Sequence, residues 1–276
     1  MHNKSMKRGK KGQVTLFVVI AIVLVSVVVL LLVLKPEIIR PKMSEEEAKR
    51  FLAPQIEELR VFTANCVEKT ALNYFERIGM HAGYYKYDGL NAINFSGDKV
   101  VVAYKSPGGE FVNALPSLSL IEKGFDIYMQ EEGYKMLDEC TDNFKSFKKV
   151  MGIEEGAREI TAECREEDVI VNVVWSITAS KADVSLDAKP KDVKLLIPLK
   201  TLWSIASDIV NYEADGGIFI GESIDRYVFA NDRKLRKARI ESELYPTHKE
   251  ALILLRSIPY RTGEEEYIFN FAINRT

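Results

Sequence analysis

The sequence predicts an α+β protein, in which an N-terminal transmembrane helix precedes a mixed helical and antiparallel-sheet extracytoplasmic region. Residues 14–34 form an uncharged run of 21 residues, 18 of which are Val, Leu, Ile or Phe. Beyond this run, helical spacing of apolar residues and strand-like alternation occupy separate parts of the chain. The regular strand–helix alternation of a parallel sheet is missing from the sequence, which favours the α+β class.

The run from Val14 to Leu34 predicts the transmembrane helix. At about 1.5 Å per residue, it would span the roughly 30 Å hydrocarbon core of a bilayer. A buried core helix is the alternative, but such helices rarely run this long without a polar face. A cleaved secretory signal would have a shorter apolar region. We therefore expect a retained anchor, with the lipid bilayer as a partner.

Basic residues before the anchor predict its orientation. Residues 1–35 contain no acid, so residues 1–13 are expected to form a basic cytoplasmic leader. The chain would then cross the cell membrane once, and its C-terminal region would lie outside. The basic residues of the leader are Lys4, Lys7, Arg8, Lys10 and Lys11.

Residues 35–43 are expected to form a hinge. Pro36 and Pro41 stand just beyond the apolar run, and proline interrupts a helix because it lacks a backbone donor. Ser44 is a suitable N-cap for a new helix, since three glutamates follow it in the first turn. The anchor is thus predicted to be decoupled from the region that follows.

A long amphipathic helix is predicted from Ser44 to about Ile78. Its apolar positions recur at spacings of three and four residues, which is typical of a helix with one buried face. We expect a kink at Pro54 and a stop at Gly79. The positions on this stripe include Ile56, Leu59, Phe62, Cys66, Thr70 and Tyr74.

A hairpin and a second helical segment are expected next. Residues 83–106 predict two short strands around a turn at Ser96-Gly97-Asp98. Helical spacing returns from Leu120 to about Met151, and Gly124 and Gly133 are expected to divide this segment into shorter helices. The apolar stripe of this segment comprises Tyr134, Leu137, Cys140, Phe144 and Phe147.

Strands dominate the remainder of the prediction. Residues 159–189 indicate a hairpin or meander, residues 198–216 a helix that begins near Pro198, and the last 45 residues two or three strands. The middle strand of the meander is expected to bury Val169, Val171, Val173 and Trp175 on one face. The final strand alternates Tyr267, Phe269, Phe271 and Ile273.

The outer region can be divided in two ways. A boundary near Gly156 gives a helix-rich part with a β-hairpin over residues 44–155, and a β-rich part with an embedded helix over residues 156–276. A single layered domain over residues 44–276 is the alternative. The chain is long enough for either arrangement.

Composition and motifs exclude several classes of function. Residues 36–276 carry 32 basic and 40 acidic side chains, so nucleic acid is not expected as a partner. His81 and His248 stand isolated, and the HExxH, P-loop, GxSxG and dinucleotide-binding motifs are absent from the sequence. We therefore expect no metal, no cofactor and no enzyme activity, although carboxylates from distant segments leave a glycosidase-like site open. The tyrosine-rich residues 83–89 suggest either packing on the sheet or a recognition loop.

Three cysteines lie in the part expected outside the membrane. Cys66 and Cys140 both fall on the apolar stripe of a predicted helix, so packing of the two helices could bring their sulfurs within bonding range. Buried free thiols and pairs that include Cys164 are the alternatives. If the first pair forms, Cys164 is left over, either buried or joined to a second chain.

Two tripeptides match the acceptor pattern for N-glycosylation. They are Asn94-Phe95-Ser96 and Asn274-Arg275-Thr276, and both lie on the side expected outside. Such a short pattern often arises by chance, so each stays a candidate site.

The junction KKGQVTLFVVIAIV, residues 10–23, resembles the prepilin-type (class III) signal of archaeal type IV pilin-like proteins. In that family a basic pair and a glycine precede a glutamine and a long apolar helix. Lys10, Lys11 and Gly12 match the leader, and the resemblance implies a cut between Gly12 and Gln13 by a prepilin-type peptidase. It also implies self-association through Val14 to Leu34 in a filament core.

Two features depart from the family pattern. Phe17 stands where the mature family sequence commonly has glutamate, and Pro36 and Pro41 interrupt a helix that is usually continuous. The outer region resembles membrane-anchored archaeal surface proteins that share a helix cysteine, a following Gly-Tyr motif and a closing aromatic strand. That second resemblance implies no activity.

Two hypotheses of function follow, from different classes. The first is a membrane-anchored structural or adhesive protein of the cell surface, of pilin-like type, either a filament subunit or a minor component. The second is a single-pass, signal-anchored ectodomain that binds a partner or ligand at the envelope without forming filaments. An anchored extracytoplasmic enzyme is a third and weaker hypothesis.

Overall fold

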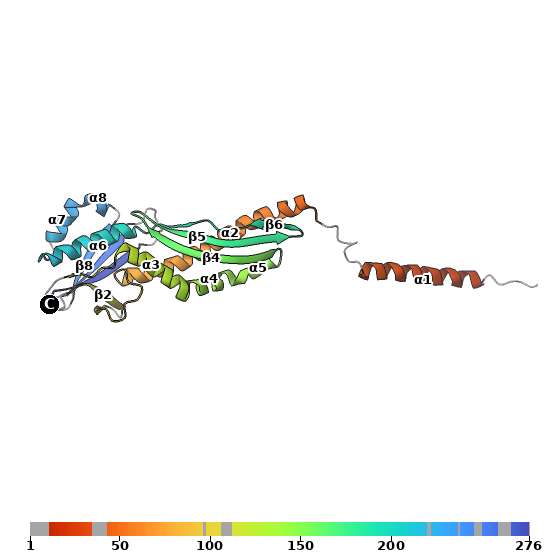
Figure 1. Cartoon of the computed structure of the whole chain (residues 1–276), viewed down its shortest axis with the longest axis horizontal. Helices are drawn as coiled ribbons and strands as arrows, with labels where there is room; N and C mark the ends of the chain where they lie inside the picture. The colour runs from red at the N-terminus through yellow and green to blue at the C-terminus, as the bar shows by residue number, and fades with distance from the viewer. Residues whose placement is uncertain are drawn as a thin grey trace, which may run out of the picture. The chain divides into compact units, whose positions relative to one another are not determined.

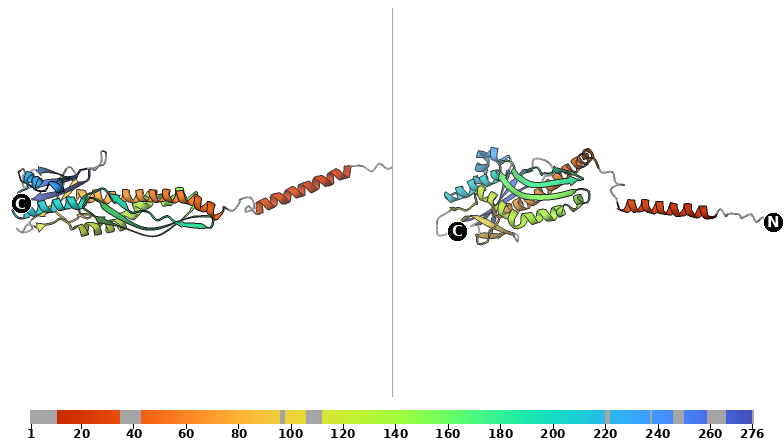
Figure 2. Two further views of the ribbon diagram at one scale, coloured as in Figure 1. Left: turned by 90° about the horizontal axis from the view of Figure 1, so that it is seen from above. Right: turned by 45° about the vertical axis from the view of Figure 1, so that its right-hand side comes forward.

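A computed structural model describes residues 11–34, 43–95, 98–105, 112–219, 222–236, 238–245, 250–258 and 266–275. The chain divides into two compact units. The first comprises Met1–Phe51 with Ala182–Val184, and the second comprises Leu52–Lys181 with Ser185–Thr276. Each unit is described by itself below (Figures 1 and 2).

The first unit holds helix α1, Lys11–Leu34, and the start of helix α2, Glu45–Met80. Counting only the residues with described side chains, no helix reaches the length and apolarity of a membrane span. Ser44 caps α2 as expected. The Glu47 backbone N–H donates to Ser44 Oγ at 3.2 Å, and the Ser44 N–H donates to Glu47 Oε2 at 2.9 Å. Residues 1–10 and the expected hinge residues 35–42 lie outside the described part.

Helix α2 continues two residues past the predicted end at about Ile78, so the stop expected at Gly79 is wrong. A side chain at Gly79 would stand 2.2 Å from the backbone oxygen of Ile268, which means that glycine allows close approach of a strand. The helix ends where Ala82 and Gly83 adopt positive φ angles of 57° and 90°. Pro54 lies inside α2.

Six strands form the larger sheet, in the order β1-β2-β10-β9-β8, with β3 paired to β2. The hairpin β1–β2 is the one expected, and β8, β9 and β10 account for the strands expected at the end of the chain. All pairs are antiparallel except β2 and β10, which run parallel with Ala272 opposite Val102. The strands are β1 (Ala92–Phe95), β2 (Asp98–Lys105), β3 (Val112–Asn113), β8 (Ala238–Tyr245), β9 (Glu250–Ser257) and β10 (Ile268–Asn274).

The centre of this sheet is buried on both faces. The alternating residues of the last strand, Tyr267, Phe269, Phe271 and Ile273, are all buried, and Asn270 and Ala272 between them are buried as well. Helix α6, Leu199–Ala214, packs along β2, β9 and β10 (Figures 1 and 2). On the other side, the Tyr267 hydroxyl donates to the Phe75 carbonyl of α2 at 2.8 Å.

The second sheet is a long curved hairpin, β4 (Gly152–Cys164) and β5 (Val169–Lys181), with the short strands β6 (Val184–Asp187) and β7 (Val193–Leu195). The face predicted for the middle strand is confirmed, because Val169, Val171, Val173 and Trp175 are all buried. Figure 1 shows the hairpin beside the segment that contains α3 to α5, and α3 and α5 contact β4. Gly156, near which a boundary was expected, lies inside β4.

The second helical segment is broken twice. It consists of α3 (Leu118–Tyr128), a π-helical turn (Met129–Gly133), α4 (Tyr134–Thr141), a 3-10 turn (Asp142–Phe144) and α5 (Lys145–Lys148). The division at Gly133 was expected. Gly124, in contrast, lies within α3, where a side chain would stand 2.6 Å from the Tyr74 hydroxyl. The second break places three residues, Asp142–Phe144, in the left-handed region.

Three helices precede the last strands of the chain. Helix α6 follows Pro198 and ends before Gly216, as predicted. Helices α7 (Glu222–Ala230) and α8 (Asp232–Leu235) were not predicted from the sequence. Both lie between α6 and the last three strands in chain order (Figure 1).

Candidate binding groove and the predicted site residues

A groove of about 600 Å³ runs between α2, the end of β7 and the strands β9 and β10. Its size and mainly apolar lining fall in the range typical of small-molecule sites. The lining residues that the structure describes all belong to the second unit. They are Glu68, Leu72, Glu76, Met80, Lys194, Leu195, Leu196, Ile197, Ser257, Ile258, Glu266, Tyr267 and Ile268.

Helix α2 presents one wall of the groove. Glu68, Leu72, Glu76 and Met80 recur every fourth residue, so they form a stripe along one side of the helix. Carboxylates alternate with apolar side chains along this stripe. The wall is therefore amphipathic along the helix axis, rather than apolar on one face and polar on the other.

The floor of the groove has its polar groups satisfied internally. Besides its bond to Phe75, Tyr267 donates its backbone N–H to Ser257 Oγ at 2.7 Å and accepts from the Ser257 N–H at 2.8 Å. Burial raises the pKa of Tyr267 well above its usual value, so the hydroxyl stays neutral. A ligand on this floor meets ring and hydrocarbon surface.

Among the described residues, some charged side chains around the groove have an ion-pair partner and others have none. Lys194 Nζ lies 2.7 Å from Asp168 Oδ2, and Glu266 Oε2 lies 3.8 Å from Arg256 Nη1. Within the described residues, Glu68 and Glu76 take part in no ion pair or hydrogen bond. The groove thus carries two carboxylates that the described part of the protein does not neutralise.

A second hollow of about 320 Å³ adjoins the groove and shares Glu68 and Lys194 with it. It follows α2 toward Glu57, whose carboxylate lies 3.2 Å from Lys191 Nζ. Arg60 donates to the Asp187 carbonyl at 3.0 Å. The charges of this second hollow are thus largely paired with each other.

A third hollow of about 530 Å³ lies between α6 and α8. Lys200, Arg233 and Arg236 line it together with Glu166 and Glu167, and Arg236 also pairs with Asp232 at 3.3 Å. Because acids and bases are mixed on its wall, this hollow does not select one sign of charge. The groove along α2 is the better candidate.

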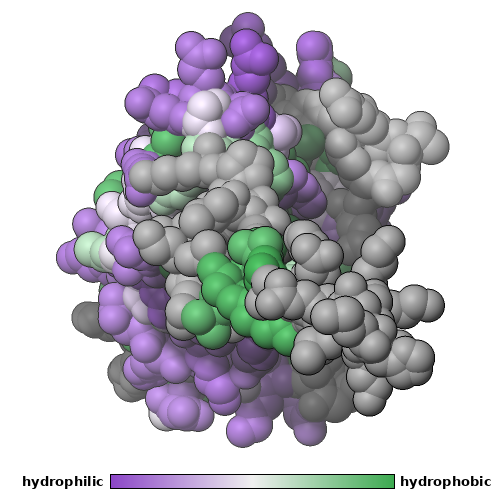
Figure 3. Space-filling view, turned by 90° about the vertical axis from the view of Figure 1, so that its right-hand side faces the viewer, coloured by the Kyte–Doolittle hydropathy of each residue, from purple (hydrophilic) through white to green (hydrophobic). Residues whose placement is uncertain are grey.

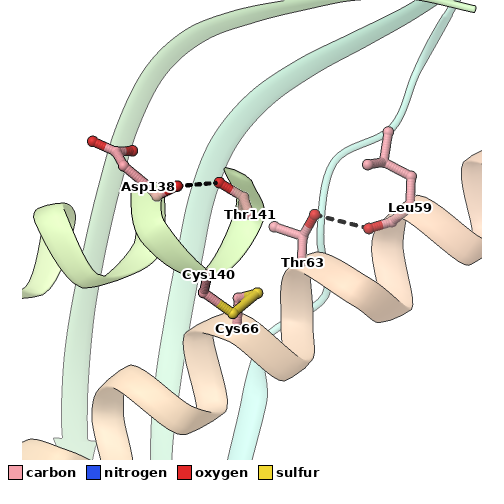
Figure 4. The surroundings of a disulfide bond; sticks show 6 residues. All are labelled: Leu59, Thr63, Cys66, Asp138, Cys140 and Thr141. Carbon is pink, nitrogen blue, oxygen red and sulfur yellow. Dashed lines mark hydrogen bonds between the residues drawn. A yellow bond between two sulfur atoms is a disulfide. The ribbon is translucent and has the colours of Figure 1, made fainter. Parts of the chain in front are cut away.

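The structure brings the predicted cysteine pair together. The sulfurs of Cys66 and Cys140 lie 2.08 Å apart, at disulfide distance, and join α2 to α4 (Figure 4). Thr63 donates to the Leu59 carbonyl at 2.8 Å, and Thr141 donates to the Asp138 carbonyl at 3.4 Å, so each helix satisfies its own threonine beside the bond (Figure 4).

Cys164 is a free, buried cysteine at the end of β4. Its backbone N–H donates to Glu122 Oε1 at 2.9 Å. Burial, with smaller effects of the Glu122 and Glu163 carboxylates, raises the pKa of its thiol to about 12. The thiol is therefore protonated and unreactive at neutral pH.

The tyrosine-rich residues after α2 are used in packing. Tyr85 is buried, and its hydroxyl donates to Glu131 and Glu132 at 3.2 and 3.1 Å. Tyr87 stacks on His81 with ring centroids 4.1 Å apart. No group of His, Cys, Asp or Glu in the described part is arranged to hold a metal ion. His248 lies outside that part.

The remaining predicted site residues are not brought to the groove. Asn94 is exposed on β1 and Asn274 is half-buried at the end of β10, whereas Ser96 and Thr276 of the two acceptor patterns lie outside the described residues. Lys11, Gly12 and Gln13 lie in the first turn of α1, and Lys10 precedes the described part. The peptidase junction stays a prediction.

Comparison with known proteins gives no relative. No protein-family model, no curated protein and no solved structure matches this chain. The function is therefore inferred from the chain alone.

The groove itself was missed at the sequence level. The four-residue spacing of Glu68, Leu72, Glu76 and Met80 is visible in the sequence, but the stripe that contains Tyr74 and Ile78 is the more apolar one. The other walls come from β7 and β10, more than 100 residues further along the chain. Helical periodicity does not report such a pairing.

Proposed function

We propose that this chain is a membrane-anchored cell-surface protein of pilin-like type, held by α1, with the second unit outside the cell. One observation carries the proposal. The large apolar side chains of α1 between Val18 and Leu30 are each 47–62% exposed. Since about 3.6 residues complete a helical turn, the successive exposed residues Ile22–Val25 cover the whole circumference. Such a helix needs an apolar environment on every side.

A bilayer or a bundle of like helices supplies that environment. Figure 3 shows a cluster of strongly hydrophobic residues in green, and α1 carries exposed large apolar side chains at nearly every position from Val18 to Leu30. Contiguous exposed apolar surface of this kind typically marks a membrane or protein interface. Residues 14–34 are long enough for one crossing, and the basic leader favours a cytoplasmic N-terminus.

The pilin-like assignment is supported by the junction at Gly12. Mass spectrometry of the native N-terminus tests it, with chain purified from membranes of the source cells. We expect a mature chain that begins at Gln13. A chain that begins at Met1 or His2 would contradict processing by a prepilin-type peptidase. Substitution Gly12→Leu is expected to abolish the cut, whereas Gly9→Leu, in the same leader, should leave it unchanged.

A signal-anchored ectodomain that binds a ligand is the second candidate, and the groove along α2 favours it. In that case the N-terminus would be uncut and the protein would not form filaments. Crosslinking of a variant that carries two cysteines in each chain, Val19→Cys and Val23→Cys, separates the two candidates. A ladder of crosslinked copies supports filament assembly, and monomers alone support the ectodomain.

A further inference from the structure

The groove along α2 places two unneutralised carboxylates at either side of an apolar patch. Glu68 and Glu76 are eight residues apart on one helix, so their backbone positions are separated by about 12 Å along its axis. Leu72 lies between them on the same stripe, and Tyr267, just before β10, and Ile268, its first residue, line the same groove. An occupant is thus offered anionic ends and a hydrocarbon middle.

The other charged side chains that the structure describes in the groove leave its charge negative. Lys194 is held by Asp168, and Glu266 is near Arg256, so each has a partner of opposite charge. The Tyr267 hydroxyl is neutral and already donates to Phe75. Among the described lining residues, Glu68 and Glu76 are therefore the groups that select the charge of an occupant, and they select cations.

We propose that the groove binds aliphatic diamines, that is, a hydrocarbon chain with an ammonium group at each end. The chain lies on Leu72, Tyr267 and Ile268, and the two ammonium groups pair with Glu68 and Glu76. The volume of about 600 Å³ accommodates a ligand of this class. The proposal rests on the second candidate function, a signal-anchored ectodomain that binds a ligand, and it gives the chemical class of that ligand.

Isothermal titration calorimetry tests the proposal, with the full chain in phosphatidylcholine nanodiscs and empty nanodiscs as the blank. The probes are 1,8-diaminooctane, octylamine, octanol and suberic acid, which share the chain length and differ in their ends. We expect the diamine to bind most tightly, octylamine more weakly, and the diacid not at all. A shorter diamine, 1,4-diaminobutane, should bind more weakly because it cannot reach both carboxylates.

Substitutions in the groove test whether Glu68 and Glu76 bind the ammonium groups of the ligand. Glu68→Gln and Glu76→Gln should each weaken diamine binding about two- to fivefold, the range for partly exposed ion pairs. Leu72→Lys should abolish binding, because it puts a cation on the apolar patch. Glu58→Gln is the matched control, since Glu58 is exposed on the same helix and lines neither hollow. Circular dichroism shows that each variant is folded.

Four outcomes would overturn the proposal. Equal affinities for diamine and octylamine, or unchanged affinity in the double variant Glu68→Gln/Glu76→Gln, would show that the carboxylates do not select the ligand. Binding of octanol without the diamine would overturn the ligand class but leave a ligand-binding ectodomain. Binding of a Lys-Leu-Leu-Leu-Lys peptide without the diamine would replace the ligand by a polypeptide partner.

Discussion

At the scale of single residues, Arg158 joins a helix to the long hairpin. Its guanidinium lies 4.6 Å from the ring centre of Tyr134 and 5.5 Å from that of Trp175. It also pairs with both oxygens of Asp138, the longer of the two contacts being 3.1 Å. Only a planar, forked cation makes these contacts together. Arg158 therefore contributes both charge pairing and ring stacking.

Replacing this guanidinium tests its role. Arg158→Lys should lower the free energy of unfolding by about 1–2 kcal/mol, because lysine keeps the charge but loses the bidentate pair and the stacking. Urea unfolding of the full chain in detergent measures it. Arg165→Lys is the matched control, since Arg165 pairs with Glu163 on the surface and its replacement should leave the stability nearly unchanged. Equal losses in the two variants would contradict the assignment.

Buried acids with raised pKa values predict a loss of stability at high pH. The pKa of the Cys164 thiol rises from 9.0 to about 12, and that of Tyr128 from 10.0 to about 12, both mainly through burial. The unfolded chain therefore releases these protons first as pH rises. The contribution of these two groups to stability should be constant up to about pH 9 and be lost between about pH 9 and 12.

Thermal unfolding between pH 7 and pH 11 measures this effect. The variant Cys164→Ala removes one titrating group, so its unfolding temperature should fall less steeply above pH 9 than that of the unchanged chain. Parallel curves for the two proteins would show that the buried thiol does not contribute to the pH dependence.

At the scale of elements, the sequence predicted local features well. The cap at Ser44, the hairpin β1–β2 and the buried face of β5 follow from short-range patterns. Features set by distant contacts were not predictable. Gly79 looked like a helix stop, but it is a glycine because Ile268 lies against it, nearly 190 residues further along the chain. The parallel pairing of β2 with β10 also joins residues that are far apart in the chain, so local sequence patterns do not predict it.

The helix break at Asp142–Phe144 is another feature that could not be predicted from local sequence. Asp and Asn tolerate the left-handed region, but Phe144 does so at a cost that local sequence does not explain. Phe144 is fully buried, with its ring 5.9 Å from that of Trp175. Burial of the ring offsets the strain of the backbone.

The disulfide links α2 to α4 over 74 residues of chain. In the chain-entropy model, a loop of this length stabilises the fold by about 4 kcal/mol. The double variant Cys66→Ser/Cys140→Ser should lose about this much in urea unfolding. Reductant should lower the stability of the unchanged chain to that of the variant, and should not affect the variant. A double variant as stable as the unchanged chain would show that the bond does not constrain the unfolded state.

At the scale of the whole molecule, the second unit and helix α1 differ in the kind of surface that they expose. The second unit has a core rich in buried aromatic residues, and a disulfide joins two of its helices. Helix α1 instead exposes apolar residues on every side. The sequence foretold this contrast, because charge and hydropathy change abruptly at residue 35. It could not foretell the groove, whose walls come together only when α2, β7 and β10 pack.

We propose that α1 anchors the chain and that the region after it lies outside the cell. Labelling of a Lys49→Cys variant in intact cells with a membrane-impermeant maleimide tests the claim most directly. Lys49 is exposed near the start of α2, and the native cysteines are either paired or buried, so background labelling is low. We predict labelling in intact cells, with the protein retained in membranes after alkaline extraction. Labelling only after permeabilisation, or release by alkaline extraction, would contradict the account.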